Sequence, residues 1–136
     1  MRYLGIDYGT KRVGVAVSDE SGMLAFPYTI LENDKALVGK VKAICEKEKI
    51  EQIIVGESVD YKGNPNIVME AIGRFAEELH TATDLLVSHE REFLSTQQAR
   101  FFQPDKKRVD DSAAAIILQS YLDKKNVKPL SQDEQI

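Results

Sequence analysis

The sequence predicts an α/β fold in which a mixed five-stranded sheet carries helices on both faces. Three short β-rich segments open the chain with only brief turns between them, which favours an antiparallel meander. Two later apolar segments alternate with stretches of helical spacing, a pattern typical of crossover connections that add parallel strands. The chain of 136 residues is long enough to bury one core of ordinary size, so one main domain is expected.

The first half of the chain supplies the meander, one helix and one further strand. The three antiparallel strands are expected over residues 3–7, 13–18 and 24–31. A helix is expected over residues 34–49, because apolar residues recur there at helical spacing and Asn33 or Asp34 can cap its start. The run Ile53-Ile54-Val55 is apolar throughout, as is typical of a strand buried on both faces.

The second half supplies the remaining crossover units and a polar end. We expect, in order, a polar loop over 57–64, a helix that begins near Pro65, a strand over 85–87, a short helical stretch over 95–102, a loop over 103–108 and a last helix over 110–122. The residues after this helix are polar and are expected to fray. The expected organisation is therefore a domain over residues 1–123 and a polar C-terminal tail over 124–136.

Composition narrows the class of protein. Hydrophobic residues make up 43% and charged residues 29%, which is typical of a soluble globular chain. No apolar run is long enough for a membrane span and no signal-peptide layout is visible, so a cytoplasmic location is expected. Cys45, the one cysteine, falls on the apolar face of a predicted helix and is expected to be a core residue. The net charge of −4 argues mildly against nucleic acid, although basic residues outnumber acidic ones between Ala99 and Lys128.

The most informative segment is the first predicted hairpin. An apolar run ends on Asp7, a glycine-containing turn follows, and a second β-branched run begins. A carboxylate at the lip of a strand can hold a cation beside a phosphate. Gly5, Gly9 and Gly14 leave room for a ligand in the same segment. The alternative is an aspartate that only caps its own turn.

Acidic residues are expected to converge where the parallel strands end. They are Asp7, Glu57, Glu90 and either Asp110 or Asp111. Carboxylates gathered in this way repel one another unless a divalent cation compensates, and hard oxygen ligands favour Mg²⁺ or Mn²⁺. Two such ions about 3.5–4 Å apart suit phosphodiester hydrolysis, because one activates the attacking water and the other stabilises the leaving oxygen. The alternatives are a capping role for Asp110 and Asp111, a polar loop at Glu57 and an exposed charged strand end at Glu90.

The N-terminal segment also carries a family likeness. Residues 5–16 (GIDYGTKRVGVA) resemble the N-terminal signature of the YqgF/RuvX family, which has a ribonuclease H-like fold and is similar to the RuvC resolvases. Segments over 53–56, 90–100 and 109–122 agree with that family in order and spacing, so the likeness spans roughly residues 2–122. It implies metal-dependent cleavage of structured nucleic acid, because members are described as Holliday-junction resolvases and as nucleases that mature the 5′ end of pre-16S ribosomal RNA.

The resemblance also implies roles for individual residues. The acidic positions that match the family's are Asp7, Glu90 and Asp110, with Asp7 bridging the metal ions and the other two completing their ligation. The implied phosphate contacts are Lys11, Arg12 and Arg91. Glu57 stands where the family usually has an apolar residue, and it is a further candidate metal ligand. Glu92 is the alternative to Glu90 if the register of the strand differs, and His89 is a minor candidate.

Three functions are compatible with these patterns. A metal-dependent endonuclease is the first, and its substrate, DNA junction or pre-rRNA, stays open. The second is a non-catalytic RNA- or ribosome-binding module that keeps the fold. The third, an actin-like ATPase or sugar kinase, shares the Gly-x-Asp-x-Gly-Thr pattern but needs two such domains, for which 136 residues are too few. Cutting both strands of a junction would favour a dimer and trimming RNA needs one site, so a monomer or weak homodimer is expected.

Overall fold

The computed structural model of the protein describes residues 1–57, 65–90 and 113–134. Five strands form one mixed sheet, and their bounds are β1 Tyr3–Tyr8, β2 Arg12–Ser18, β3 Ala25–Glu32, β4 Gln52–Glu57 and β5 Leu86–His89. They lie across the sheet in the order β3-β2-β1-β4-β5. β2 pairs antiparallel with both β1 and β3, whereas β4 pairs parallel with both β1 and β5. The predicted meander followed by parallel strands is therefore confirmed.

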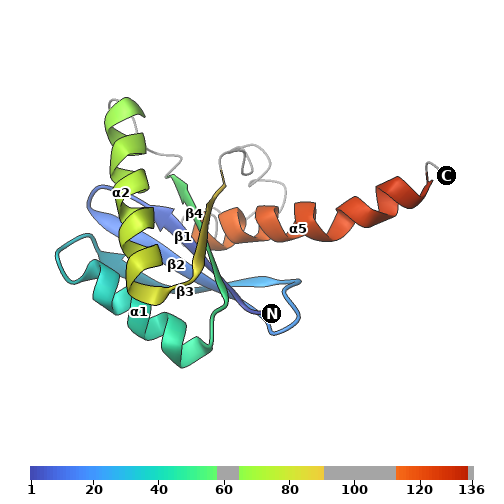
Figure 1. Ribbon diagram of the computed structural model, residues 1–136, viewed down its shortest axis with the longest axis horizontal. Helices are drawn as coiled ribbons and strands as arrows, with labels where there is room; N and C mark the ends of the chain where they lie inside the picture. The colour runs from blue at the N-terminus through green and yellow to red at the C-terminus, as the bar shows by residue number, and fades with distance from the viewer. Residues whose placement is uncertain (58–64, 91–112, 135–136) are drawn as a thin grey trace.

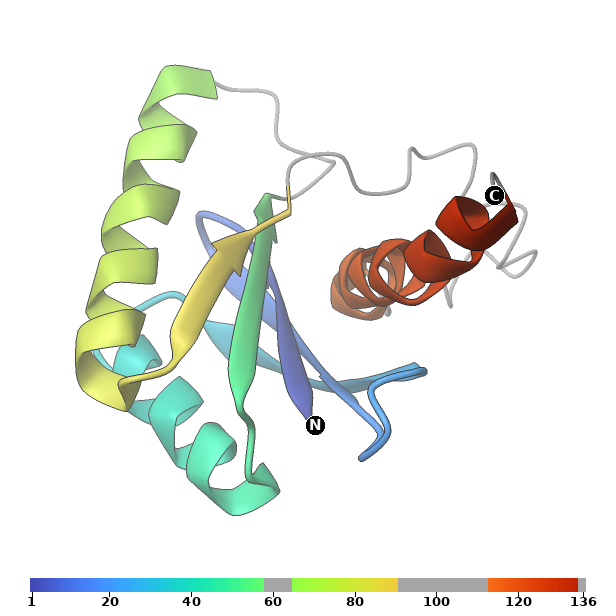
Figure 2. The same ribbon diagram turned by 45° about the vertical axis from the view of Figure 1, so that its right-hand side comes forward.

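Helices cover both faces of this sheet, as Figures 1 and 2 show. α1 Leu37–Glu48 and α2 Pro65–Thr83 lie on one face, and α5 Ala113–Glu134 lies on the other. The predicted helical stretch over 95–102 falls outside the described residues. Within the described part of the chain, none of the helices has the length and apolar character needed to cross a membrane.

Each face of the sheet buries its own hydrophobic cluster. On the side of α1 and α2, the strands contribute Leu4, Ile6, Val13, Val15, Ile53 and Val55. On the side of α5, the cluster contains Tyr3, Ala16, Ile54, Ala114, Ala115, Ile117, Leu118 and Leu122. The apolar run of β4 thus sends neighbouring side chains to opposite faces, which confirms a strand buried on both. Cys45 packs in the first cluster and is 4% exposed, so it is the core residue that the sequence predicts.

The start of α1 differs from the prediction. The sequence predicts a helix from Asp34, whereas α1 begins at Leu37 with Ala36 as its N-cap. Asp34 closes a turn before the helix, because its Oδ1 accepts a hydrogen bond from the Ala36 N–H at 2.9 Å and its carbonyl accepts one from the Leu37 N–H at 3.1 Å. The side chain of Asn33 donates to the Gly9 carbonyl at 2.8 Å, so neither predicted cap serves as one.

The end of α5 also differs from the prediction. The sequence predicts a helix end near Leu122 and fraying from Lys124, whereas α5 continues to Glu134. Polar side chains of this extension contact the sheet and its turns: Lys124 Nζ lies 3.3 Å from Glu90 Oε2, Lys125 Nζ lies 6.0 Å from the centre of the Tyr3 ring, and Asn126 Nδ2 donates to the Gly22 carbonyl at 3.2 Å. These contacts hold the helix against the sheet as far as Asn126, beyond the point where the apolar periodicity stops.

α5 packs close to the backbone of the sheet. A Cβ added at Gly5 would lie 2.6 Å from the Cβ of Leu118, and a Cβ at Gly56 would lie 2.9 Å from the side chain of Ile117. Real Cβ atoms do not approach so closely, so these two glycines let the helix sit directly on β1 and β4. This close packing brings the first turn of α5 to the ends of β1 and β2.

Candidate active site

Asp7 lies near the carboxyl end of β1, on the face of the sheet that α5 covers. Side chains alternate along a strand, and Tyr3 and Gly5 on the same face of β1 contact α5. The residues level with Asp7 on the neighbouring strands are both glycines, Gly14 on β2 and Gly56 on β4. The half-buried carboxylate therefore has no strand side chain on either flank, although the side chain of Ile117 on α5 covers Gly56.

Glu90 comes directly after β5 and joins the same edge of the sheet. His89 pairs with Val55, and the Glu90 N–H donates to the Val55 carbonyl at 2.8 Å, which brings Glu90 level with Gly56. Its side chain is 11% exposed, and its Oε2 lies 3.3 Å from Nζ of Lys124 on α5. Glu90 and Asp7 therefore share one face, with β4 between them. Two strand spacings separate their Cα atoms by about 10 Å.

The structure describes the other predicted acidic residues only in part. The backbone of Glu57 ends β4 beside Tyr8, but its side chain, like Arg91, Glu92, Asp110 and Asp111, lies outside what the structure describes. Among the described residues, no three His, Cys, Asp or Glu side chains gather as a metal site. The structure thus places Asp7 and Glu90 on one face at one edge of the sheet, and their convergence with the other acids on a metal site stays a prediction.

His89 lies apart from these two acids. It pairs with Val55, whose side chain packs in the cluster beneath α1 and α2. Because neighbouring side chains of a strand point to opposite faces, His89 lies on the α2 side while Glu90 lies on the α5 side. The half-buried imidazole is therefore not placed to act with Asp7.

Of the predicted phosphate contacts, Lys11 lies in the turn between β1 and β2 and Arg12 is the first residue of β2, both at the same end of the sheet as Asp7. Both side chains are exposed. Asn33 fixes this turn, because its Nδ2 donates to the Gly9 carbonyl at 2.8 Å and its N–H donates to the Lys11 carbonyl at 2.9 Å. A Cβ at Gly9 would lie 2.5 Å from the Arg12 carbonyl oxygen, so the turn requires glycine there. The basic pair is thus held at the rim of the site.

A pocket of about 120 Å³ opens beside Asp7, and we call it the Asp7 pocket. The residues that line it come from four elements and their ends: Asp7, Arg12, Gly14, Val15, Pro27, Thr29, Ile30, Ala113 and Ala114. It therefore has an acidic wall, a basic rim and an apolar wall on the edge strand β3. The first turn of α5 completes it.

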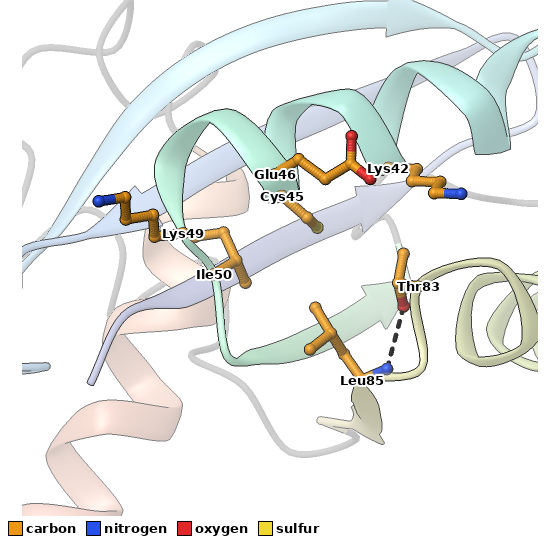
Figure 3. Close-up of a pocket in the computed structure, with 7 residues that line it drawn as sticks. All are labelled: Lys42, Cys45, Glu46, Lys49, Ile50, Thr83 and Leu85. Carbon is orange, nitrogen blue, oxygen red and sulfur yellow. Dashed lines mark hydrogen bonds between the residues drawn. The ribbon is translucent and has the colours of Figure 1, made fainter.

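A larger pocket of about 270 Å³ lies at the opposite end of the sheet, where β4 and β5 begin (Figure 3). Figure 3 shows Cys45 pointing into it, with the ammonium groups of Lys42 and Lys49 directed away from each other. Burial raises the pKa of the Cys45 thiol to about 11, so it stays protonated at neutral pH. The lining has one carboxylate, Glu46. We therefore place the candidate site at the smaller pocket, where the acids are.

Sequence reasoning missed two residues that shape the site. The sequence suggests Asn33 as a helix cap, whereas its side chain fixes the Lys11 turn. The sequence places Lys124 in a frayed tail, whereas it forms an ion pair with Glu90. A signal for Lys124 exists in the sequence, because it follows Ile117 and Tyr121 at spacings of seven and three residues and so continues the inward face of the helix.

Known proteins resemble this chain over most of its length. The family model RuvX, described as Holliday junction resolvase, matches residues 1–124. A protein of Nitratidesulfovibrio vulgaris named "Putative pre-16S rRNA nuclease" is 36% identical over 132 residues, which cover 90% of this chain and 93% of that protein. A protein of the same name from Syntrophus aciditrophicus is 38% identical over 133 residues, which cover 90% of this chain and 89% of that protein.

Solved structures share the fold. RuvC of T. thermophilus in complex with a Holliday junction substrate gives a TM-score of 0.54 at 14% identity, over 86% of this chain and 92% of that chain. The fowlpox virus Holliday junction resolvase gives a TM-score of 0.51 at 16% identity, over 91% of this chain and 99% of that chain. This likeness confirms the predicted ribonuclease H-like fold. With the family model matched over residues 1–124 and relatives matched over nine-tenths of the sequence, the chain belongs to the RuvX family.

Proposed function

We propose that this protein is a metal-dependent endonuclease that hydrolyses phosphodiester bonds in structured nucleic acid. The observation that carries the proposal is the placement of Asp7 and Glu90 level with each other on one face of the sheet, with Gly56 of β4 between them. Processing of the 5′ end of pre-16S rRNA is the substrate choice that the names of the curated relatives favour. Resolution of Holliday junctions is the second candidate, favoured by the description of the family.

The donor set suits Mg²⁺ or Mn²⁺. Carboxylate oxygens are the hard ligands that these ions prefer. Glu90 already faces one cation, the Lys124 ammonium at 3.3 Å, although its side chain is only 11% exposed. Asp7 and Glu90 would hold the ions, with Asp110 and Glu57 as further ligands. When bound, such ions lower the pKa of the attacking water and neutralise charge on the reacting phosphate.

Chain connectivity supports Asp110 as a third acid. Ala113 lines the Asp7 pocket, and Asp110 precedes it by three residues. Because consecutive Cα atoms are 3.8 Å apart, the Cα of Asp110 is within about 11 Å of that of Ala113. This reach is short enough for its carboxylate to join Asp7 in one site.

The basic side chains of Lys11 and Arg12 bind the backbone of the nucleic acid. Lys11 and Arg12 are exposed at the same end of the sheet as Asp7, and Asn33 fixes the backbone between them and β3. Charged donors of this kind bind phosphate oxygens and give most of the affinity for a nucleic-acid backbone. Arg91, next to Glu90 in the sequence, is the third proposed phosphate contact. These side chains hold the scissile phosphate against the acids.

The test is cleavage of a labelled pre-16S 5′-leader RNA and of a labelled four-way DNA junction, each with Mg²⁺, Mn²⁺ or EDTA. We expect cutting with either metal, none with EDTA, and none with Asp7→Asn. Asp84→Asn is the matched control, because Asp84 is exposed at the far end of the sheet and its φ of 61° suits asparagine. Cutting that survives Asp7→Asn contradicts the proposal. Tight binding of RNA without cutting would identify a non-catalytic binding module instead.

A further inference from the structure

We infer that the Asp7 pocket binds the pyrimidine base of a nucleotide next to the phosphate that is cleaved. The inference rests on the proposed function and adds a base preference to it. It starts from one row across the sheet on the α5 side: Asp7 on β1 is level with Gly14 on β2, and Gly14 is level with Ile30 on β3. Glu90 lies at the other end of the row, beyond Gly56. The side chain of Ile117 covers Gly56, whereas the gap over Gly14, toward Ile30, belongs to the Asp7 pocket.

The gap toward Ile30 has the walls that a nucleotide needs. Because Gly14 has no side chain, about 10 Å separates the Cα atoms of Asp7 and Ile30, which are two strand spacings apart. Pro27 and Ile30 make the wall on β3, and Ile30 is 57% exposed. Arg12 lines the same pocket. An apolar surface for a flat ring thus lies beside a guanidinium that can bind the phosphate of the same nucleotide.

The size of the pocket selects the ring. Its volume is about 120 Å³, and a protein cavity of roughly 150 Å³ holds one benzene molecule. The Asp7 pocket is smaller than that and open on one side, so one six-membered ring can enter it only with an edge outside, and the two fused rings of a purine exceed it by far more. A base stacked on Ile30 would remove from water part of an apolar side chain that is 57% exposed.

Two variants change the pocket while leaving the fold intact. Gly14→Ala adds a methyl group to the floor, where its Cβ would lie 3.5 Å from the Cβ of Ala114 and 3.6 Å from the Cβ of Asp7, both ordinary contacts. Ile30→Ser removes the apolar wall at an exposed position. Phe26→Ser is the matched control, because Phe26 is 48% exposed on the same strand but is level with Val17, which packs on the opposite face.

The first measurement is the rate of cleavage of leader RNAs in which each nucleotide beside the cut is changed between pyrimidine and purine. Wild-type protein should prefer the pyrimidine at one of these positions by about tenfold, the lower end of what a misfitting group costs in an apolar pocket. Gly14→Ala and Ile30→Ser should reduce the preference to about twofold or less, and Phe26→Ser should keep it. A preference that both pocket variants retain, or no preference in the wild type, overturns the inference.

A second measurement separates this inference from the nuclease proposal. Leader RNA that carries single 4-thiouridines is photocrosslinked to the wild-type protein in EDTA, where no cutting is expected. Crosslinks should map to the segment of β3 that contains Pro27 and Ile30. Crosslinking there by a protein that never cuts would uphold the pocket and refute the nuclease. Metal-dependent cutting with crosslinks only elsewhere would uphold the nuclease and refute the pocket.

Discussion

Two glycine-to-alanine substitutions on the same face of the sheet should have opposite effects on stability. In Gly5→Ala the new Cβ would lie 2.6 Å from the Cβ of Leu118 and 3.1 Å from the carbonyl oxygen of Ala114, so α5 must move. Overpacking of this kind costs about 1–3 kcal/mol. In Gly14→Ala the nearest atoms are 3.5 and 3.6 Å away, and the smaller entropy of the unfolded chain stabilises the protein by about 0.4–1 kcal/mol. The free energies of unfolding of the two variants should therefore differ by about 1.4–4 kcal/mol.

Urea unfolding followed by circular dichroism measures this difference. With a slope of about 2 kcal/mol per M, the midpoint of Gly5→Ala should lie about 1 M below that of Gly14→Ala. Both variants should keep the slope of the wild type, because neither changes the surface exposed on unfolding. Equal midpoints would show that α5 does not rest on the backbone of β1. The placement of the first turn of α5 beside Asp7 would then lose its support.

Three further predictions concern single side chains. At neutral pH, Cys45 should react with a thiol reagent about 100-fold more slowly in the native protein than in urea. The reason is that raising the pKa of the thiol from 9.0 to about 11 lowers the thiolate fraction by that factor. Equal rates would contradict the burial of Cys45. Hydrogen bonds from the Ser21 side chain and from the Met23 and Leu24 backbone lower the pKa of Asp19 from 3.8 to about 2. The stability that this carboxylate contributes is complete above pH 3.8 and is lost as the pH falls toward 2. Asp19→Asn should therefore reduce the loss of unfolding free energy between these pH values. An unchanged pH dependence in this range would refute the role of Asp19. Lys124→Gln removes the cation that competes with a metal ion for Glu90. Because the lysine is half exposed, Mn²⁺ binding measured by calorimetry should become only about twofold tighter. Weaker Mn²⁺ binding would show that Lys124 helps to form the site.

Local patterns were enough to predict most of the fold. The apolar run in β4, the short turns of the meander and the helical spacing over α1 and α2 each reflect contacts close in sequence, and all are confirmed. The placement of Asp7 and Glu90 at one edge followed from strand ends alone. Errors arose where distant residues decide. Asn33 donates to the distant Gly9 carbonyl instead of capping α1, and polar residues of α5 beyond Leu122 contact the sheet and its turns.

The Asp7 pocket could not be predicted from the sequence because it depends on a register shift. The pairing of β2 with β3 shifts by one residue between Val15 and Ala16, and this irregularity makes Ile30 the partner of Gly14. Without the shift, Thr29 would be level with Gly14, and the apolar side chain of Ile30 would lie on the other face. A one-residue bulge leaves no distinctive pattern in a strand of mixed composition, so only the structure reveals the row from Ile30 to Glu90.

The central claim is that Asp7 and Glu90 hold the same divalent cations, and Mn²⁺ titration calorimetry tests it without any substrate. The protein is compared with Asp7→Asn, Glu90→Gln, the double variant and the Asp84→Asn control. We predict that each single change at the site weakens Mn²⁺ binding by at least about tenfold and that the double change adds little, because the two losses concern one site. Mn²⁺ affinity that is unchanged in both single variants, or losses that simply add, would contradict the account.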